Sequence, residues 1–293
     1  MTEKTSGRGR RIAKAIAVIP AALIVILYFL YPMGVGIFAV IPAREDSGSP
    51  PEGFTAVELS ASDEAKLAGW YTPGTNGIGI LVLHGSRSNR NALRAHISML
   101  AKNGYAVLAL DMRGHGASGG KANAFGWQST SDVRGALDYL LKQPGIKKAG
   151  ALGLSMGGEA LLSAASDCPE LTAIVSEGAS HRCMGDYLSL PENRGFMHSW
   201  TARVLYFTVG TLTGCREPKP IAESIASAPG AALLLIASGG SKKEIDYNTM
   251  YAKTAGDRAE LWIADGASHT GALAAYPNDY EQRVVAFFQK IMS

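Results

Sequence analysis

A short segment around Ser155 has the residue types that nucleophilic catalysis needs. Residues 153–158 read Gly-Leu-Ser-Met-Gly-Gly and lie between the apolar run 148–152 and the helix-forming run 159–165. A serine at a sharp turn between a strand and a helix is presented to substrate, and glycines two positions before and after it remove side chains that would clash. The free N–H groups of the following helix point to where negative charge develops on an oxyanion. The segment therefore predicts Ser155 as a nucleophile.

A serine nucleophile needs a base, and the base needs a carboxylate that orients it. After a turn of this kind the expected chain order is serine, acid, histidine. His269 lies in the loop 264–271, just after the strand predicted at 259–264. The acid should follow the strand predicted at 231–237, where Glu244 and Asp246 both qualify. Glu244 is nearer to the strand end and is preferred, but the sequence leaves Asp246 open.

Acyl transfer also needs hydrogen-bond donors for the oxyanion, and backbone N–H groups supply them in most enzymes of this type. Met156, directly after Ser155, is the first predicted donor. The second is predicted in the loop 84–89, whose small residues allow close approach, with the amide of Ser86 as the best candidate. Water would resolve the acyl-enzyme, so this chemistry requires no metal and no organic cofactor.

A second Gly-x-Ser-x-Gly pattern occurs at residues 116–120, centred on Ser118. It overlaps a Gly-x-Gly-x-x-Gly that runs from Gly114 to Gly119 and could indicate a dinucleotide site. A pyrophosphate site needs a helix N-terminus at this point. The residues after Gly120 have no helical apolar periodicity, and no acidic residue closes a following strand. The context argues against Ser118 as nucleophile and against an oxidoreductase.

The elements that must position these residues alternate between strand and helix. The predicted strands lie at 54–59, 67–72, 78–83, 105–110, 148–152, 172–175, 231–237 and 259–264, and the predicted helices at 91–102, 131–142, 159–165, 247–255 and 279–292. Such alternation predicts an α/β fold with a mostly parallel sheet and helices on both faces. Residues 182–227 break the alternation, and we interpret them as a helical lid over the carboxyl ends of the strands. The alternative is an ordinary crossover with an extra helix.

The N-terminus predicts a membrane anchor. Residues 1–14 contain five basic residues against one acidic residue, and residues 15–43 contain no charge. A helix of about 20 apolar residues spans a bilayer, and the basic flank would stay in the cytoplasm, which places the catalytic domain outside it. A cleaved signal peptide is the alternative, but the run lacks an A-x-A-like cleavage site. Residues 44–53, rich in Pro, Gly and Ser, are predicted as a linker to a hydrolase domain at 54–293.

The amino-acid composition further narrows the class of protein. The 293 residues are 47% hydrophobic, which is enough for a large core, and the net charge of +3 is concentrated in the N-terminal segment. The rest of the chain has no excess of basic residues of the kind that binds nucleic acid. The three cysteines, Cys168, Cys183 and Cys215, have no metal-binding spacing. Cys183 and Cys215 could pair in an oxidising compartment, or all three could stay unpaired.

Four segments together resemble the α/β-hydrolase family, in its lipase, esterase and serine-aminopeptidase-like branch. They are His84-Gly85, Asp-Met-Arg-Gly-His-Gly-Ala-Ser at 111–118, the segment 153–158, and the loop 266–269. The similarity extends over about residues 54–293, and the N-terminal apolar run resembles membrane-anchored members. The resemblance implies a structural role for 111–118, so Arg113 and His115 receive no catalytic role. The loop after Gly85 has fewer glycines than the usual pattern, and the acid loop lacks the common Gly-x-x-Asp.

These observations predict a membrane-anchored serine hydrolase that cleaves an ester-type acyl bond through an acyl-enzyme on Ser155. The substrate would be a small molecule or a lipid with an acyl group, since pocket shape rather than the triad sets selectivity. An acyltransferase or a serine peptidase would use the same residues. A binding protein that has the fold without the chemistry is the remaining alternative.

Overall fold

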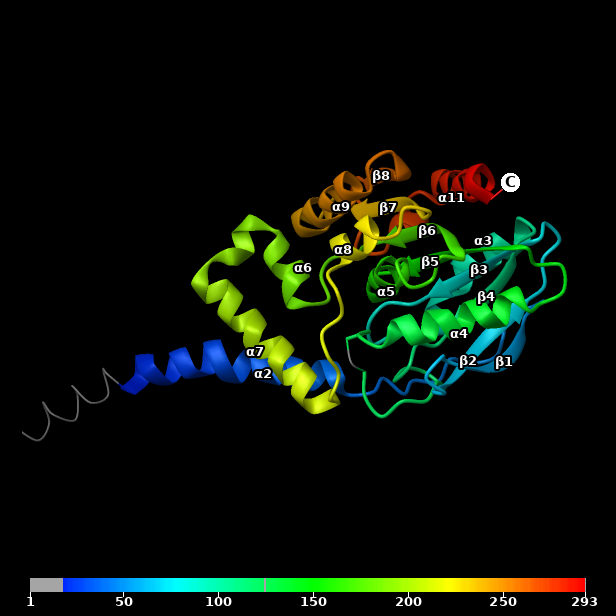
Figure 1. Cartoon of the computed structure of the whole chain (residues 1–293). Coiled ribbons are helices and arrows are strands. Elements are labelled where there is room, and N and C mark those ends of the chain that lie inside the picture. The colour runs from blue at the N-terminus through cyan, green and yellow to red at the C-terminus, as the bar shows by residue number, and fades with distance from the viewer. Residues whose placement is uncertain (1–17, 124, 293) are drawn as a thin grey trace, which may run out of the picture.

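The computed structural model describes residues 18–123 and 125–292. The basic segment predicted at 1–14 lies outside the described residues. Most of the described chain forms one eight-stranded sheet with helices on both faces (Figure 1). This confirms the predicted α/β fold with a mostly parallel sheet.

The strand order is β1-β2-β4-β3-β5-β6-β7-β8, and only β2 runs antiparallel to both of its neighbours. The strands are β1 (Thr55–Ser60), β2 (Lys66–Thr72), β3 (Ile78–Leu83), β4 (Ala106–Leu110), β5 (Lys148–Leu154), β6 (Leu171–Glu177), β7 (Ala232–Ser238) and β8 (Ala259–Ala264). All six residues of β3 are buried, because both faces of the central sheet are covered. Alternate β3 residues therefore enter different cores, with Ile80 and Val82 in one and Leu81 and Leu83 in the other.

Two helical layers supply these cores. Side chains of α4 (Ser129–Leu141), α5 (Met156–Ala164), α8 (Ile221–Ala226) and α9 (Lys242–Ala255) pack on one face of the sheet. Side chains of α3 (Arg94–Lys102) and α11 (Pro277–Met292) pack on the other. The apolar stripe predicted for the last helix is present, since Tyr280, Val284 and Phe288 are all buried. The short α10 (Ala272–Ala275) precedes α11.

The N-terminal helix extends away from the sheet domain (Figure 1). Val18–Val40 is continuous helix, 23 residues long with a mean hydropathy of 2.3, and most of it is exposed. At 1.5 Å per residue it is about 34 Å long, enough to cross a hydrocarbon core of about 30 Å. It includes a π-helical turn, η1 (Ile26–Leu30), followed by α2 (Tyr31–Val40). Pro32 lacks the N–H of a regular helical hydrogen bond, which accounts for the irregular turn before it.

The chain between β6 and β7 forms a helical cap. It contains α6 (Met184–Ser189), the short 3₁₀ turn η3 (Pro191–Arg194), α7 (Phe196–Thr213) and α8. Ile221 and Ile225 of α8 belong to the main core, so α6 and α7 are the part that stands off the sheet. Helix α7 crosses α2 (Figure 1), and they touch where Gly36 faces Thr208. A Cβ at Gly36 would lie only 3.0 Å from Cβ of Thr208.

The residues after the N-terminal helix, namely Ala43 and the predicted linker 44–53, are held against the domain rather than hanging free. Ala43 exchanges backbone hydrogen bonds of 2.8 Å with Gly114 and Gly116. The Ser47 hydroxyl donates to the buried Asp111 carboxylate at 2.9 Å. These contacts connect the N-terminal helix firmly to the sheet domain. The stretch is rich in Pro, Gly and Ser, a composition that does not distinguish a packed segment from a flexible linker.

All three cysteines are unpaired. The Cys183 thiol donates to Asp186 at 3.3 Å, and Cys215 contacts the Thr213 carbonyl, so the pairing considered from the sequence does not occur in the structure.

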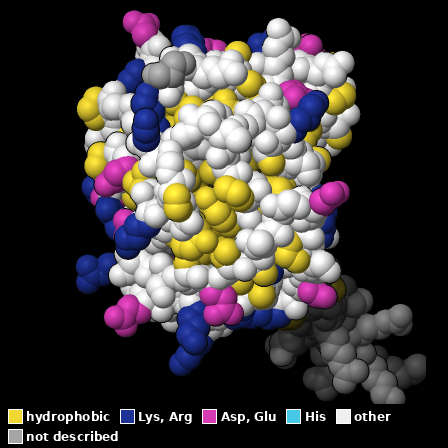
Figure 2. Space-filling model, turned by 90° about the vertical axis from the view of Figure 1, so that its right-hand side faces the viewer, with side chains coloured by type: hydrophobic (Ala, Val, Ile, Leu, Met, Phe, Trp, Pro, Cys, Tyr) yellow, Lys and Arg dark blue, Asp and Glu magenta, His cyan; other side chains and the backbone are white. Residues whose placement is uncertain are grey.

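On the face turned away from the N-terminal helix, Figure 2 shows basic and acidic side chains interspersed around a small apolar area.

Candidate active site

Ser155 stands at the turn between β5 and α5 in a strained backbone conformation. Its φ of 52° and ψ of −119° are rare for a residue with a side chain. The turn is possible because Gly153 and Gly157 pack backbone against backbone, and a Cβ at Gly153 would overlap Gly157. A Cβ at Gly157 would in turn lie 2.5 Å from the Leu83 carbonyl oxygen of β3. The sequence motif thus builds the strand–turn–helix geometry that it predicted.

Three side chains from distant parts of the chain meet at this turn. His269 Nε2 lies 2.9 Å from Ser155 Oγ, and His269 Nδ1 lies 2.7 Å from Glu244 Oε1. Ser155 follows β5, Glu244 follows β7 and His269 follows β8, so all three sit at the carboxyl ends of parallel strands. Such a chain of hydrogen bonds allows the imidazole to accept a proton from the hydroxyl while the carboxylate holds its other nitrogen.

Glu244 occupies the first turn of α9. Sequence patterning placed the start of this helix near residue 247, but it begins at Lys242, because the Ser241 hydroxyl caps it by accepting from the Glu244 N–H. The second carboxylate oxygen of Glu244 accepts the Ser238 N–H at 3.1 Å. Burial works against ionisation here, but the hydrogen bonds from His269 and Ser238 hold the pKa of Glu244 below its ordinary value. The bond to Glu244 outweighs burial and raises the pKa of His269.

Asp246, the other carboxylate left open by the sequence, is not brought to His269. It lies on α9 beside Lys242, with which it forms an ion pair across one helical turn. The Asp246 carboxylate is therefore paired with the exposed Lys242 ammonium group. The geometry favours Glu244 for the position next to the histidine.

The segments that contain the predicted oxyanion donors lie beside Ser155. Met156 is the first residue of α5, so its N–H has no partner within the helix. The loop after β3 abuts the turn, since a Cβ at Gly85 would lie 3.3 Å from Ser155 Cβ, and Ser86 follows directly. The structure therefore brings the segments of both predicted donors next to the serine.

Two histidines hold the loop after β3 in place. His84 Nε2 accepts the Met112 N–H at 3.0 Å, and His115 Nε2 accepts the Arg87 N–H at 3.2 Å. Burial lowers the pKa of His84 to about 4 and also lowers the pKa of His115, so both imidazoles are neutral acceptors near neutral pH. The motif at 111–118 is thus structural: it braces the loop that carries Ser86.

The second Gly-x-Ser-x-Gly has no catalytic geometry. Ser118 is buried, and its hydroxyl donates to the Asp111 carbonyl at 2.5 Å and accepts the Ala68 N–H at 2.8 Å. Gly116 sits directly under the Asp111 carboxylate. The next described helix, α4, begins only at Ser129. A dinucleotide site would need a helix start beside these glycines.

Glu177 is a site residue that the sequence analysis missed. It ends β6, next to the strand that carries Ser155, and its buried carboxylate accepts the Ala272 N–H at 2.8 Å and the Tyr280 hydroxyl at 2.9 Å. Burial raises its pKa. It thereby fixes the chain just after His269. An acidic residue at the end of a buried strand was the signal that could have indicated it.

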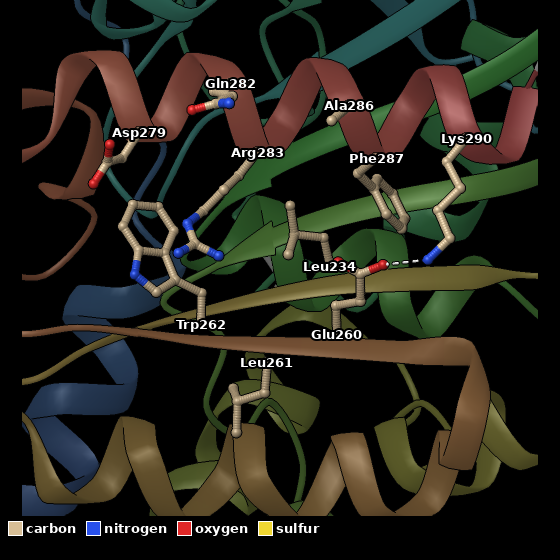
Figure 3. A pocket seen from close by; sticks show the side chains of 10 residues that line it. All are labelled: Leu234, Glu260, Leu261, Trp262, Asp279, Gln282, Arg283, Ala286, Phe287 and Lys290. Carbon is tan, nitrogen blue, oxygen red and sulfur yellow. Dashed lines mark hydrogen bonds and ion pairs between the residues drawn. The ribbon is translucent and has the colours of Figure 1, made fainter.

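A cavity of about 570 Å³ lies at the far edge of the sheet, between β8 and α11 (Figure 3). Three of its charged side chains, Glu260, Arg283 and Lys290, contact partners within the cavity wall. Lys290 bonds Glu260 at 2.8 Å, and Arg283 stacks 4.9 Å from the Trp262 ring centre. None of the three residues that meet at the turn lines it. Among the described residues, no cluster of His, Cys, Asp and Glu is arranged to hold a metal ion.

Comparison with known proteins agrees with this fold. Residues 78–229 match the family model described as serine aminopeptidase, S33. No curated protein sequence matches the chain. The esterase Pf2001 of Pyrococcus furiosus is 26% identical with a TM-score of 0.68, and the match covers 86% of this chain and 99% of the esterase.

Two further solved structures share the fold. The α/β hydrolase GrgF from Penicillium sp. sh18 has a TM-score of 0.64 and 15% identity, over 82% of this chain and 99% of that one. Est1E from Butyrivibrio proteoclasticus, solved with ferulic acid bound, has a TM-score of 0.62 and 18% identity, over 80% and 99%.

Proposed function

Because this chain belongs to the serine aminopeptidase S33 family of α/β hydrolases, we propose that it hydrolyses carboxylic esters through an acyl-enzyme on Ser155. The observation that carries the proposal is the pair of hydrogen bonds that join Ser155, His269 and Glu244 in one line. Family membership makes the protein a hydrolase. The geometry supports a serine nucleophile as the means of hydrolysis.

In the first half-reaction the Ser155 hydroxyl oxygen attacks the acyl carbonyl carbon, and His269 Nε2 takes the hydroxyl proton. Glu244 holds the opposite nitrogen and stabilises the imidazolium that forms. The tetrahedral intermediate collapses as the bond to the alcohol breaks, and His269 returns the proton to the departing alkoxide oxygen. The acyl group is then an ester of Ser155.

In the second half-reaction a water molecule replaces the alcohol. His269 takes a proton from the water as its oxygen attacks the acyl carbonyl, and the bond to Ser155 breaks with return of the proton to the serine oxygen. A carboxylic acid leaves. In both steps the oxyanion would receive hydrogen bonds from the Met156 and Ser86 amides, aided by the positive end of α5.

Ester substrates are favoured over peptides by the similarity to the Pyrococcus furiosus esterase, which extends over 99% of that enzyme. The family model takes its description from an aminopeptidase, so peptides are the natural competitor in a test. The two substrate classes share the triad and differ in the leaving group that His269 must protonate.

We further propose that the helix Val18–Val40 anchors the enzyme in a membrane. Its length and hydropathy support a span, and the five basic residues at 1–14 favour a cytoplasmic N-terminus with the hydrolase domain on the other side. Protease protection in sealed vesicles, with digestion from either side, would test this orientation.

The test of the catalytic proposal is a comparison of kcat/KM for p-nitrophenyl esters and aminoacyl p-nitroanilides with the full-length protein in detergent. We expect ester hydrolysis to exceed anilide hydrolysis and to fall more than about a thousandfold in Ser155→Ala. Ser163→Ala, two turns along α5, is the matched control and should keep its activity. Retained esterase activity in Ser155→Ala would overturn the assignment, and preferred anilide cleavage would make the enzyme a peptidase.

A further inference from the structure

An apolar groove of about 440 Å³ runs between the N-terminal helix and the cap. Leu27, Tyr31 and Val35 form its wall on the N-terminal helix, and Tyr187, Leu205 and Tyr206 form its wall on the cap. No Asp, Glu, Lys or Arg lines it. Tyr31 is 67% exposed, so the groove is open along the helix that we propose as the anchor.

The groove lies at the depth of the hydrocarbon core for every possible position of the membrane span within the uncharged run. The uncharged run covers residues 15–43, and a span needs about 20 residues. Every placement of such a span within the run includes residues 24–34. Leu27, Tyr28 and Tyr31 therefore lie inside the span in each case, and the groove that they line is next to lipid.

The cap lies at the same depth. The ring of Trp200 in α7 packs edge-on against Phe29, with centroids 5.4 Å apart, and Phe29 belongs to every possible span. Phe196 and Phe207 of α7 are each 75% exposed. Exposed Phe and Trp side chains are typical of a helix whose apolar face is buried in a membrane. The face on the opposite side of the molecule presents charges of both signs around a central apolar area (Figure 2).

One lining residue of the groove, His181, connects it to the neighbourhood of the triad. His181 lines the groove, and its Nδ1 lies 2.7 Å from the Tyr206 hydroxyl. Gly178, three residues earlier, faces His269, because a Cβ there would lie 3.0 Å from His269 Cε1. Three residues of extended chain span at most about 11 Å. The Cα atom of His181 therefore lies within about 11 Å of the Cα atom of Gly178, the residue that abuts the catalytic imidazole.

We propose that this groove is an acyl-chain subsite that opens to the bilayer, and that the substrate is an acyl ester of a membrane lipid. The proposal rests on the proposed esterase function and on the anchor. An uncharged groove at hydrocarbon depth suits an alkyl chain and offers little to a peptide. The anchor helix then has a second role, because its inner face is one wall of the substrate site.

The matched pair of variants comes from the two faces of α2. Val35 lines the groove, whereas Ile37 lines a separate apolar hollow on the other side of the α2–α7 crossing, and the two are similarly exposed at 37% and 42%. Val35→Trp should fill the groove and Ile37→Trp should not. Thr201→Trp fills the groove from the cap wall and guards against a folding defect peculiar to Val35→Trp.

The kinetic test measures kcat/KM for p-nitrophenyl laurate and p-nitrophenyl acetate with the full chain in detergent micelles. We expect Val35→Trp and Thr201→Trp to lower the laurate-to-acetate ratio by about tenfold or more, since buried methylenes are lost. Ile37→Trp should keep the wild-type ratio. An unchanged ratio in both groove variants, with acetate hydrolysis intact, would overturn the subsite and leave the esterase function standing.

A binding test separates the subsite from the chemistry. Full-length Ser155→Ala protein is placed in phosphatidylcholine vesicles that contain a phospholipid with a diazirine on its acyl chain, and photo-adducts are mapped by mass spectrometry. We expect adducts on Tyr187 and Tyr206 that Val35→Trp suppresses, while adducts on the outward-facing Phe207 persist. Labelling of Phe207 without Tyr187 or Tyr206 would refute the subsite, whatever the esterase assays show.

Discussion

Arg87 joins the loop that carries the second predicted oxyanion donor to the end of the N-terminal helix. Its guanidinium carbon lies 4.0 Å from the centre of the Phe38 ring, and Nη1 donates to the Phe38 carbonyl at 3.3 Å. A cation at the C-terminal end of a helix also interacts favourably with the helix dipole. The helix that we propose as anchor is therefore connected directly to the loop next to Ser155.

We predict that Arg87→Ala lowers kcat for a short-chain ester about tenfold with little change in KM. The loss should stay below the hundredfold to thousandfold cost of deleting an oxyanion donor, because the loop is displaced rather than removed. Arg283→Ala, which breaks a similar stack on Trp262 far from the triad, is the control and should have wild-type kinetics. Equal kinetics of Arg87→Ala and wild type would show that the loop keeps its position without this contact.

Glu244→Gln keeps the size of the side chain but removes the charge that orients His269. We predict a loss in kcat of between about a hundredfold and ten-thousandfold, since the wrong tautomer of the imidazole is then favoured. Asp246→Asn, two residues along the same helix, should remain within about twofold of wild type. A larger loss of kcat in Asp246→Asn than in Glu244→Gln would show that Asp246, and not Glu244, is the acid of the triad.

The pH dependence of kcat/KM gives an independent check on the same pair. The base must be neutral, so activity falls as pH drops through the pKa of His269, which Glu244 raises above its ordinary value. In Glu244→Gln the stabilising charge is gone, and the acid limb should shift to lower pH. The profile of Asp246→Asn should keep the wild-type limb. If the acid limb does not move in Glu244→Gln, the group that titrates in the profile is not one whose pKa Glu244 raises.

Much of the site could be predicted from the sequence because its signals are local. Ser155 lies in a strand–turn–helix pattern, and His269 lies in the loop after the last strand, so both positions follow from chain order. The choice between Glu244 and Asp246 depends on helix phase. Side chains two positions apart on a helix point to nearly opposite sides. Which of the two faces His269 depends on where α9 begins, and the Ser241 cap starts it earlier than its apolar pattern suggests.

The contacts that the sequence did not predict join segments far apart in the chain. Glu177 bonds Ala272, just after the His269 loop, across 95 residues, and Arg87 contacts Phe38 across 49 residues. The packing of α7 on α2 depends on a close approach at Gly36. Neither periodicity nor spacing carries information on such pairings.

The nucleophile turn should tolerate no side chain at Gly153. Gly153→Ala would force a Cβ into the Gly157 backbone, and we predict a loss of about 3 kcal/mol or more in the free energy of unfolding, or no soluble protein. Gly230→Ala is the control, because nothing lies within 4 Å of its Cβ position. Urea unfolding followed by circular dichroism compares the two. Similar stability of both variants would contradict the tight packing of the turn.

His96 should make the fold sensitive to acid. Burial lowers its pKa to about 4, and neither ring nitrogen has a hydrogen-bond partner, although Glu177 lies 4.0 Å away. Between that pKa and the ordinary value of 6.5, the unfolded chain binds more protons at this residue, so stability falls as pH decreases. Relative to His96→Leu, the wild type should lose up to about 1.4 kcal/mol per pH unit in this window. Parallel stability curves for the two proteins would disprove the effect.

Ser155 is the activated nucleophile of the proposed reaction, and covalent labelling tests this role most directly. The full-length protein is treated with a fluorophosphonate, and the modified residue is identified by peptide mass spectrometry. We predict one adduct, on Ser155, that is absent in Ser155→Ala and forms far more slowly in His269→Ala, whose serine has lost its base. Undiminished labelling of Ser155→Ala, or an adduct on another serine such as Ser118, would contradict the account.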